Sequence, residues 1–250
     1  MKALAGALFG VLAYAGAASA AGDACAVASH LVQADAGLPR AAAAITKTHT
    51  LTIVVAGTTS SSLPGAEGAN LAYPARLELA LRQKLPGVAV KVVPYATPRQ
   101  TAAEMAATFP KILQKEQPSL VVWQTGTFDA MRGVAPELFQ TTLEQAVETL
   151  HEGGADVIFV NMQYSPRTDA VLASQAYAEA IRWVAIGGGV NLFDRQAIMR
   201  HWSELGTFDL LAATKSLDTA AQVHNCIGRL LADLVTDALK MSETETKESK

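Results

Sequence analysis

The chain has 250 residues, of which 50 % are hydrophobic and 17 % charged, and its formal net charge is −3. This length is enough for one globular domain with a large core. The near-neutral charge, without a run of basic residues interleaved with aromatics, argues against nucleic acid or an anionic membrane surface as a partner.

Residues 1–20 have the pattern of a signal peptide. Lys2 gives a positive start, residues 3–18 are apolar and rich in alanine, and Ala18-Ser19-Ala20 fits the small-x-small cleavage pattern. We expect cleavage after Ala20, no transmembrane segment in the remaining chain, and export, with a composition typical of a bacterial periplasmic protein. An uncleaved membrane anchor is the alternative.

Export would allow the two cysteines, Cys25 and Cys226, to pair. The bond would join an N-terminal arm, residues 21–48, to the last helical region of the domain. Two separate buried thiols are the alternative, and the sequence favours the disulfide.

The rest of the chain alternates between strands and helices. Apolar runs predict five strands, at residues 51–56, 88–93, 120–123, 157–160 and 190–193. Apolar spacing predicts helices at residues 73–85, 100–117 with a kink at Pro110, 136–151, 170–186, 198–205, and from 218 or 219 to 239.

These elements predict a three-layer α/β/α sandwich, because unbroken apolar strands indicate a parallel sheet covered on both faces. Residues 49–240 would form this one domain. The arm would carry a helical turn at residues 41–44, and the polar residues 241–250 would be a disordered tail. We expect Trp123 and Trp202 to lie in the core or in a pocket wall.

The first strand runs into a turn of small and hydroxyl residues. Gly57 is followed by Thr58, Thr59, Ser60, Ser61 and Ser62. The carboxyl end of a strand is where open α/β folds bind ligands and place their chemistry. We therefore expect the functional site here, after a central first strand.

Five blocks of sequence together resemble the SGNH/GDSL hydrolase family, in particular an exported α-proteobacterial branch. They are residues 57–61 (GTTSS), 72–77 (AYPARL), 120–127 (LVVWQTGT), 162–166 (MQYSP) and 199–202 (MRHW). The resemblance covers nearly the whole chain after the signal peptide, and it implies a flavodoxin-like fold with a five-stranded parallel sheet. It also implies ester hydrolysis by a serine after the first strand, an oxyanion hole built from a glycine N–H and an asparagine, and a histidine base oriented by an aspartate.

All five catalytic positions implied by the resemblance carry other residues. Thr59 stands at the nucleophile, Ala96 at the oxyanion glycine and Phe128 at the asparagine. When the C-terminal cysteine of the family is aligned with that of this chain, Lys215 stands at the aspartate and Asp218 at the histidine. Five substitutions together predict a lost active site.

A rearranged active site is the alternative, with Thr59 or Ser60 as nucleophile and His224 as base. Against it, the residue three positions before His224 is an alanine and not the expected aspartate. Thr59 is otherwise a hydroxyl that bonds nearby backbone in a turn. Asp218 is either a base with a raised pKa or, as we favour, the N-cap of the last helix, and His224 is otherwise a partly exposed structural residue.

We therefore expect an exported, non-catalytic relative of these hydrolases that binds an acylated glycan, another envelope component or a protein. An active esterase or O-deacetylase acting on acylated glycans or lipids, and a structural subunit of an envelope complex, are the alternatives. The binding cleft would be lined by Thr58, Thr59, Ser60, Tyr95, Thr127, Phe128 and Gln163.

The sequence predicts neither a metal nor a cofactor. The histidines show no metal-ligand spacing. The glycines at 187–189 follow a helix and precede a strand, which is the wrong order for a phosphate-binding loop. They are typical of a helix end and a turn.

Overall fold

The structure is a computed structural model that describes residues 23–211 and 217–248, with side chains up to residue 244. The expected signal peptide lies outside these ranges. Five parallel strands form one sheet in the order β2-β1-β3-β4-β5. They are β1 Thr50–Gly57, β2 Ala89–Ala96, β3 Leu120–Gln124, β4 Asp156–Val160 and β5 Asn191–Phe193.

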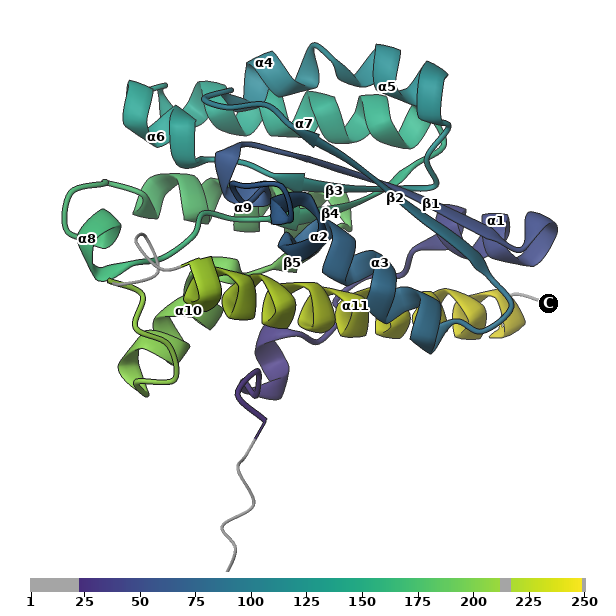
Figure 1. The fold of residues 1–250 in the computed structure, drawn as a ribbon. Coiled ribbons are helices and arrows are strands. Elements are labelled where there is room, and N and C mark those ends of the chain that lie inside the picture. Colours follow the sequence, from purple (N-terminus) through teal and green to yellow (C-terminus); the bar gives the residue numbers. More distant parts are fainter. Residues whose placement is uncertain (1–22, 212–216, 249–250) are drawn as a thin grey trace, which may run out of the picture.

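Helices cover both faces of this sheet, so the predicted three-layer α/β/α fold is confirmed (Figure 1). One face carries α1 Pro39–Thr48, α3 Tyr73–Lys84, α10 Arg195–Glu204 and α11 Leu217–Glu248. The other carries α4 Ala102–Ala106, α5 Phe109–Glu116, α7 Pro136–Glu152 and α9 Gln175–Gly188. Short helices lie in the connections: η1 Ser29–Leu31, η2 Thr59–Ser61, α2 Gly68–Leu71, α6 Thr127–Arg132 and α8 Pro166–Asp169.

The unbroken apolar runs of the strands follow from this layering. In β1, Ile53 and Val55 pack against the helices of one face, and Val54 and Ala56 pack against those of the other. Because successive side chains point to opposite faces, both halves of the alternation have to be apolar.

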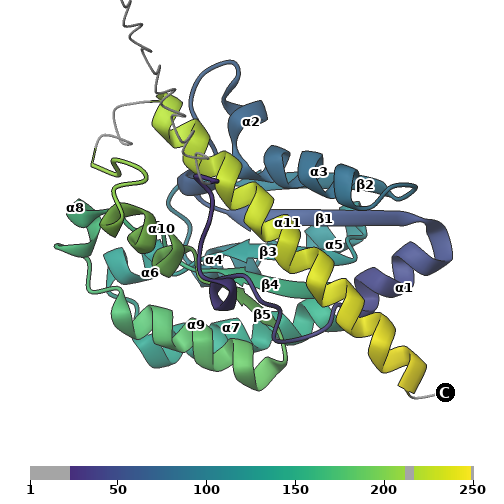
Figure 2. The same cartoon turned by 90° about the horizontal axis from the view of Figure 1, so that it is seen from below.

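Helix α11 crosses one face of the sheet and packs closely on α3 (Figure 2). A Cβ atom at Gly228 of α11 would lie 2.5 Å from the Cβ of Arg76, so only glycine allows this approach. The helix continues beyond Leu239: Met241 packs against the core and Ser242 is buried. The expected disordered tail is therefore wrong for residues 241–248, which are helical.

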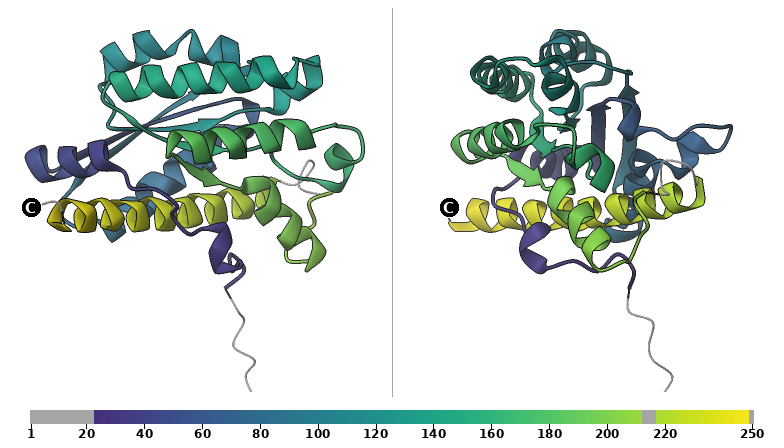
Figure 3. Two further views of the ribbon diagram at one scale, coloured as in Figure 1. Left: turned by 180° about the vertical axis from the view of Figure 1, so that it is seen from behind. Right: turned by 90° about the vertical axis from the view of Figure 1, so that its left-hand side faces the viewer.

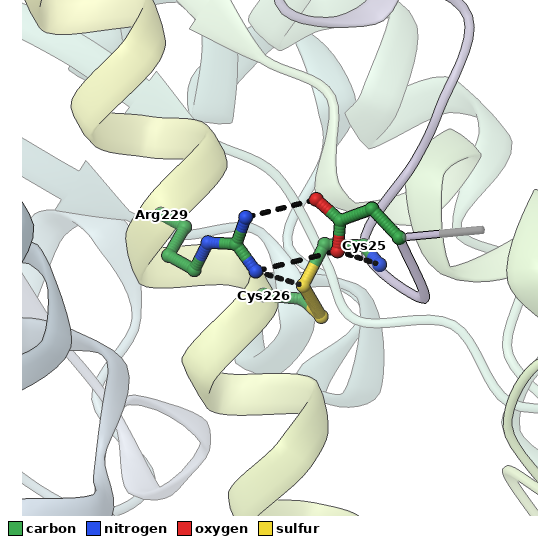
Figure 4. The surroundings of a disulfide bond; sticks show 4 residues. Cys25, Cys226 and Arg229 are labelled. Carbon is green, nitrogen blue, oxygen red and sulfur yellow. Dashed lines mark hydrogen bonds and ion pairs between the residues drawn. A yellow bond between two sulfur atoms is a disulfide. The ribbon is translucent and has the colours of Figure 1, made fainter. Parts of the chain in front are cut away.

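The predicted disulfide between Cys25 and Cys226 is present (Figure 4). It ties the arm to α11, and Arg229 of the same helix donates to the carboxylate of Asp23 at 2.8 Å and to the Cys25 sulfur at 3.4 Å. Asp23 also accepts the backbone N–H of Cys25 at 3.1 Å. The arm contains a ten-residue helix, α1, where one turn was expected.

Four further details differ from the prediction. Strand β1 lies between β2 and β3, and β3 takes the central place. Strand β2 extends to Ala96. The helix expected at 100–117 is two helices, because a capping box at Thr101 starts α4 and Pro110 occupies the first turn of α5, where a missing N–H costs nothing. Helix α9 starts at Gln175, after a separate short helix with a capping box at Ser165.

Candidate functional site

The turn after β1 lies where the direction of strand order reverses. Strand β2 lies on one side of β1, and β3 with the remaining strands lies on the other. In doubly wound folds, ligands bind beside the strand at which the strand order reverses in this way. The register sets Ala56 beside Trp123. The next residues, Gly57 and Gln124, bring the turn and the end of β3 together.

Gln124 organises this turn through its side-chain oxygen. Oε1 accepts the backbone N–H of Thr58 at 3.0 Å. The hydroxyls of Thr58, Ser60 and Ser61 each lie 3.2 Å from the same oxygen. A backbone N–H can only donate, so the amide has to present its oxygen to the turn. One oxygen with two lone pairs cannot accept four full hydrogen bonds. The three hydroxyls therefore cannot all donate fully to Gln124 Oε1 at the same time.

Gly57 provides the space for this convergence. A Cβ atom there would lie 2.3 Å from the Ser61 hydroxyl and 3.1 Å from Gln124 Oε1. Gly126 lies in the corresponding turn after β3. Its φ is +96°, and a Cβ atom there would lie 2.6 Å from Met162 Sδ. Close approach therefore favours glycine at position 57, and the positive φ favours it at position 126.

Arg195, at the start of α10, lies directly behind the turn. Its guanidinium donates to the carbonyl of Ser60 at 3.3 Å and to the Ser60 hydroxyl at 3.4 Å. The side chain is 1 % exposed, and no carboxylate of the described residues pairs with it. Burial lowers the pKa of Arg195 to about 10, so the group still carries its charge at neutral pH.

The network extends through Tyr73 to His224. The Ser61 hydroxyl lies 2.9 Å from the Tyr73 hydroxyl, and the two rings of Tyr73 and His224 have centroids 5.8 Å apart. Burial raises the pKa of Tyr73, so the phenol is neutral at pH 7 and is not a base. His224 itself is buried, where a partly exposed residue was expected.

The hydrogen bonding of His224 fixes its protonation. Nδ1 accepts the backbone N–H of Tyr73 at 3.0 Å and therefore carries no hydrogen. Burial, and to a lesser extent the Arg195 guanidinium, lower the pKa of His224 to about 4. The ring is thus neutral at pH 7 with its hydrogen on Nε2. A base of the serine-hydrolase type needs the opposite tautomer, with a free Nε2 and a hydrogen on Nδ1.

The predicted catalytic positions do not form a constellation. Thr59 is exposed, and its hydroxyl makes no hydrogen bond within the described residues. Ala96 is the last residue of β2 and pairs with Gly57, because the strand continues where the family is expected to turn. Phe128 is half-buried on α6. Asp218 is exposed in the first turn of α11, one residue inside the helix, so it is not the predicted N-cap; Lys215 lies outside the described residues.

The predicted cleft residues are also only partly gathered. Tyr95 faces α5, where its hydroxyl donates to Glu116 at 2.9 Å, and it lines a separate groove of about 290 Å³. Thr127 has a buried hydroxyl that finds no partner among the described residues. Gln163 is exposed. Of the predicted set, Thr58 and Ser60 are joined through Gln124.

Sequence reasoning missed three residues of this site. Gln124 and Tyr73 lie inside blocks that carried the family resemblance, so their positions were visible although their roles were not. Arg195 gave no signal, because an arginine next to an amphipathic helix is ordinarily exposed. Both tryptophans predicted for the core, Trp123 and Trp202, are fully buried.

A doubly wound sheet with a hydroxyl-rich turn at its switch point defines the class, and the chain has an SGNH/GDSL hydrolase-like fold. The chain belongs to the Non-GDSL lipase-like family, whose model matches residues 24–241.

Known relatives include esterases. Esterase TesA of Pseudomonas aeruginosa is 32% identical over 80 residues, which are 32% of this chain and 40% of that protein, so the match spans less than half of that relative. The crystal structure of TesA covers 56% of this chain and 76% of its own, with 27% identity and a TM-score of 0.50.

Two more distant structures share the fold alone. LAE5, a hydrolase from the metagenome of Lake Arreo, has a TM-score of 0.57 at 19% identity and covers 72% of this chain and 96% of its own. The acetyl-xylooligosaccharide esterase Axe2 of Geobacillus, solved as a mutant, has a TM-score of 0.60 at 15% identity and covers 74% of this chain and 94% of its own.

Proposed function

We propose that this chain is a non-catalytic member of its family that binds a ligand at the turn after β1. The observation that carries the proposal is the bond from the Tyr73 N–H to His224 Nδ1. It leaves the one imidazole of this network with its hydrogen on Nε2, so His224 cannot take a proton from a hydroxyl there without losing this buried bond.

The other groups around the turn support the same conclusion. The hydroxyls of Thr58, Ser60 and Ser61 face an amide oxygen, a guanidinium and a neutral phenol. None of these accepts a proton readily at neutral pH. No described carboxylate or imidazole bonds to a hydroxyl of the turn, so a nucleophile there would lack the activating base that the chemistry needs.

The charge of Arg195 favours a ligand with an anionic or strongly polar group. A buried guanidinium without a carboxylate is costly, and the Coulomb attraction of an anion near it is little screened by solvent. Thr59 is exposed on the turn, and its hydroxyl forms no hydrogen bond within the described residues, so it can donate to or accept from a ligand. An acylated or anionic glycan of the cell envelope has this chemistry.

Export is part of the proposal. It is supported by the signal-peptide pattern of residues 1–20 and by the Cys25–Cys226 disulfide, a bond that persists in oxidising compartments such as the periplasm. In the described ranges, no helix has an apolar stretch long enough to cross a bilayer.

An active ester hydrolase is the second candidate, because a curated relative is an esterase and Thr59 is exposed. A fluorophosphonate probe separates the two, since it reacts with activated hydroxyls. We expect no adduct on this protein under conditions that label an active esterase completely. A covalent adduct at Thr59 or Ser60, located by mass spectrometry of the digested protein, would establish the esterase instead.

A further inference from the structure

A groove of about 600 Å³ lies between the C-terminal parts of α7 and α9. The two helices pack side by side, in teal and green in Figure 3. The helices of a parallel α/β sheet run against its strands, so their last turns lie at the amino edge of the sheet. The groove is therefore away from the turn after β1, and its role is independent of the function proposed for that turn.

An exposed tryptophan forms one wall of the groove. Trp183 is 67% exposed, whereas Trp123 and Trp202 are fully buried. Ile186, one turn further along α9, is 69% exposed, while the buried Val147 and Val184 line the groove. Large apolar side chains gathered beside a groove are typical of an interaction site.

The opposite wall is acidic. Glu144, Glu148 and Glu152 follow one another at intervals of four residues along α7, and all three line the groove. Glu148 and Glu152 form no ion pair with any described residue. The cation of the groove, Arg40, is already matched by Asp156 at 3.2 Å. The groove therefore presents uncompensated negative charge to whatever enters it.

Two glycines of the groove, Gly187 and Gly188, lie where a side chain would fit. Gly189 ends α9 with φ +60°, a conformation that favours glycine. Gly187 and Gly188 precede it inside the helix and also line the groove. A Cβ atom at Gly187 would meet nothing within 4 Å, and one at Gly188 would make ordinary contact with Val147 at 3.6 Å. Glycine weakens a helix, and a surface from which side chains are missing allows another backbone to approach closely.

We propose that this groove binds an arginine-bearing segment of a partner protein. A guanidinium is the cation that stacks on an exposed indole face and bonds to carboxylates through two parallel N–H groups. Trp183 and the α7 glutamates offer both contacts across one groove. Gly187 and Gly188 carry no side chains, so the backbone of the segment can approach the groove there.

The test uses the purified protein and a peptide of four arginines, acetylated and amidated at its ends. Trp183 is the exposed tryptophan of the described residues, so a change in its emission on titration reports the groove. We expect saturable binding that weakens as salt is raised. Glu148→Gln should weaken it at least fivefold, and the matched variant Glu137→Gln, on the same helix but outside the groove, should leave it unchanged. Unfolding midpoints confirm that both variants fold.

Several outcomes would overturn the proposal. The first is that the arginine peptide does not bind. The second is that a peptide of four citrullines, which has the same shape without charge, binds equally well. The third is that Glu148→Gln and Glu137→Gln lose the same affinity. A concentration-dependent dimer whose formation shifts the Trp183 emission would also overturn it, by showing that a second copy of this chain fills the groove. Retained affinity in Trp183→Ala, measured by calorimetry, would refute the stacking contact.

Discussion

Replacing His224 by asparagine tests the protonation state on which the proposed function depends. The Oδ1 atom of Asn can take the place of Nδ1 and accept the Tyr73 N–H, but it does not titrate. In the wild-type protein the unfolded chain binds a proton at His224 below about pH 6.5, whereas the folded chain binds it only below about pH 4. Stability is therefore lost as the pH falls through this window.

The size of the effect follows from the two pKa values. A difference of roughly two pKa units or more corresponds to about 3 kcal/mol by pH 4, at 1.36 kcal/mol per unit. The free energy of unfolding of His224→Asn should accordingly fall less steeply than that of the wild type. The gap between them should shift by about 3 kcal/mol in favour of the variant from pH 7 to pH 4.

Urea denaturation followed by circular dichroism at several pH values measures this shift. All other titrating groups are common to both proteins and cancel in the comparison. His30→Asn is the matched control, because His30 is exposed, and its pH profile should run parallel to that of the wild type. Parallel profiles for His224→Asn and the wild type would refute the reasoning, since they would mean that His224 titrates alike in the folded and unfolded chain.

Three further predictions concern stability and can be measured by urea denaturation at pH 7. Gln124→Met should lower the free energy of unfolding by about 2 kcal/mol, because it leaves the buried Thr58 N–H without an acceptor. The control Gln83→Met, at an exposed position, should change it by less than about 0.5 kcal/mol. Equal effects of the two substitutions would contradict the role of the amide oxygen. Reducing the Cys25–Cys226 disulfide, which joins residues 201 positions apart, should lower the free energy of unfolding by about 2–5 kcal/mol. An unchanged unfolding midpoint in reductant would show that this bond does not stabilise the protein. Gly188→Ala should stabilise the protein by about 0.5 kcal/mol while weakening binding of the arginine peptide, and a loss of stability would mean that the fold itself requires this glycine.

The sheet could be predicted from the sequence because its signal is local. Parallel strands are covered on both faces, so residues such as Val54 and Val55 are both apolar and the run is unbroken. The last helix could be predicted only in part. Residues 241–250 are polar in composition, and it is the contact of Met241 with the core that extends α11 beyond the predicted end.

The sequence indicated a candidate site but not its contacts. The Gly57 turn indicated the carboxyl edge of the sheet, because the strand ends of a parallel sheet gather there, and the function of this turn remains a proposal. The hydrogen-bond network depends on the adjacency of β1 and β3 and on the position of α10, which bring Gln124 and Arg195 to Ser60 from distant parts of the chain. No spacing in the sequence encodes those contacts. The prediction that all five catalytic positions are substituted remains a prediction.

Hydrolysis of short p-nitrophenyl esters by the purified protein is the decisive test of whether the turn after β1 is catalytic. We predict that the wild-type protein releases nitrophenol at the rate of Thr59→Ala and Ser60→Ala, with none of the three above the buffer background at pH 7 to 8. Turnover well above background that is abolished by either substitution, and reduced by His224→Asn, would show a working nucleophile and base and would contradict the proposed non-catalytic function.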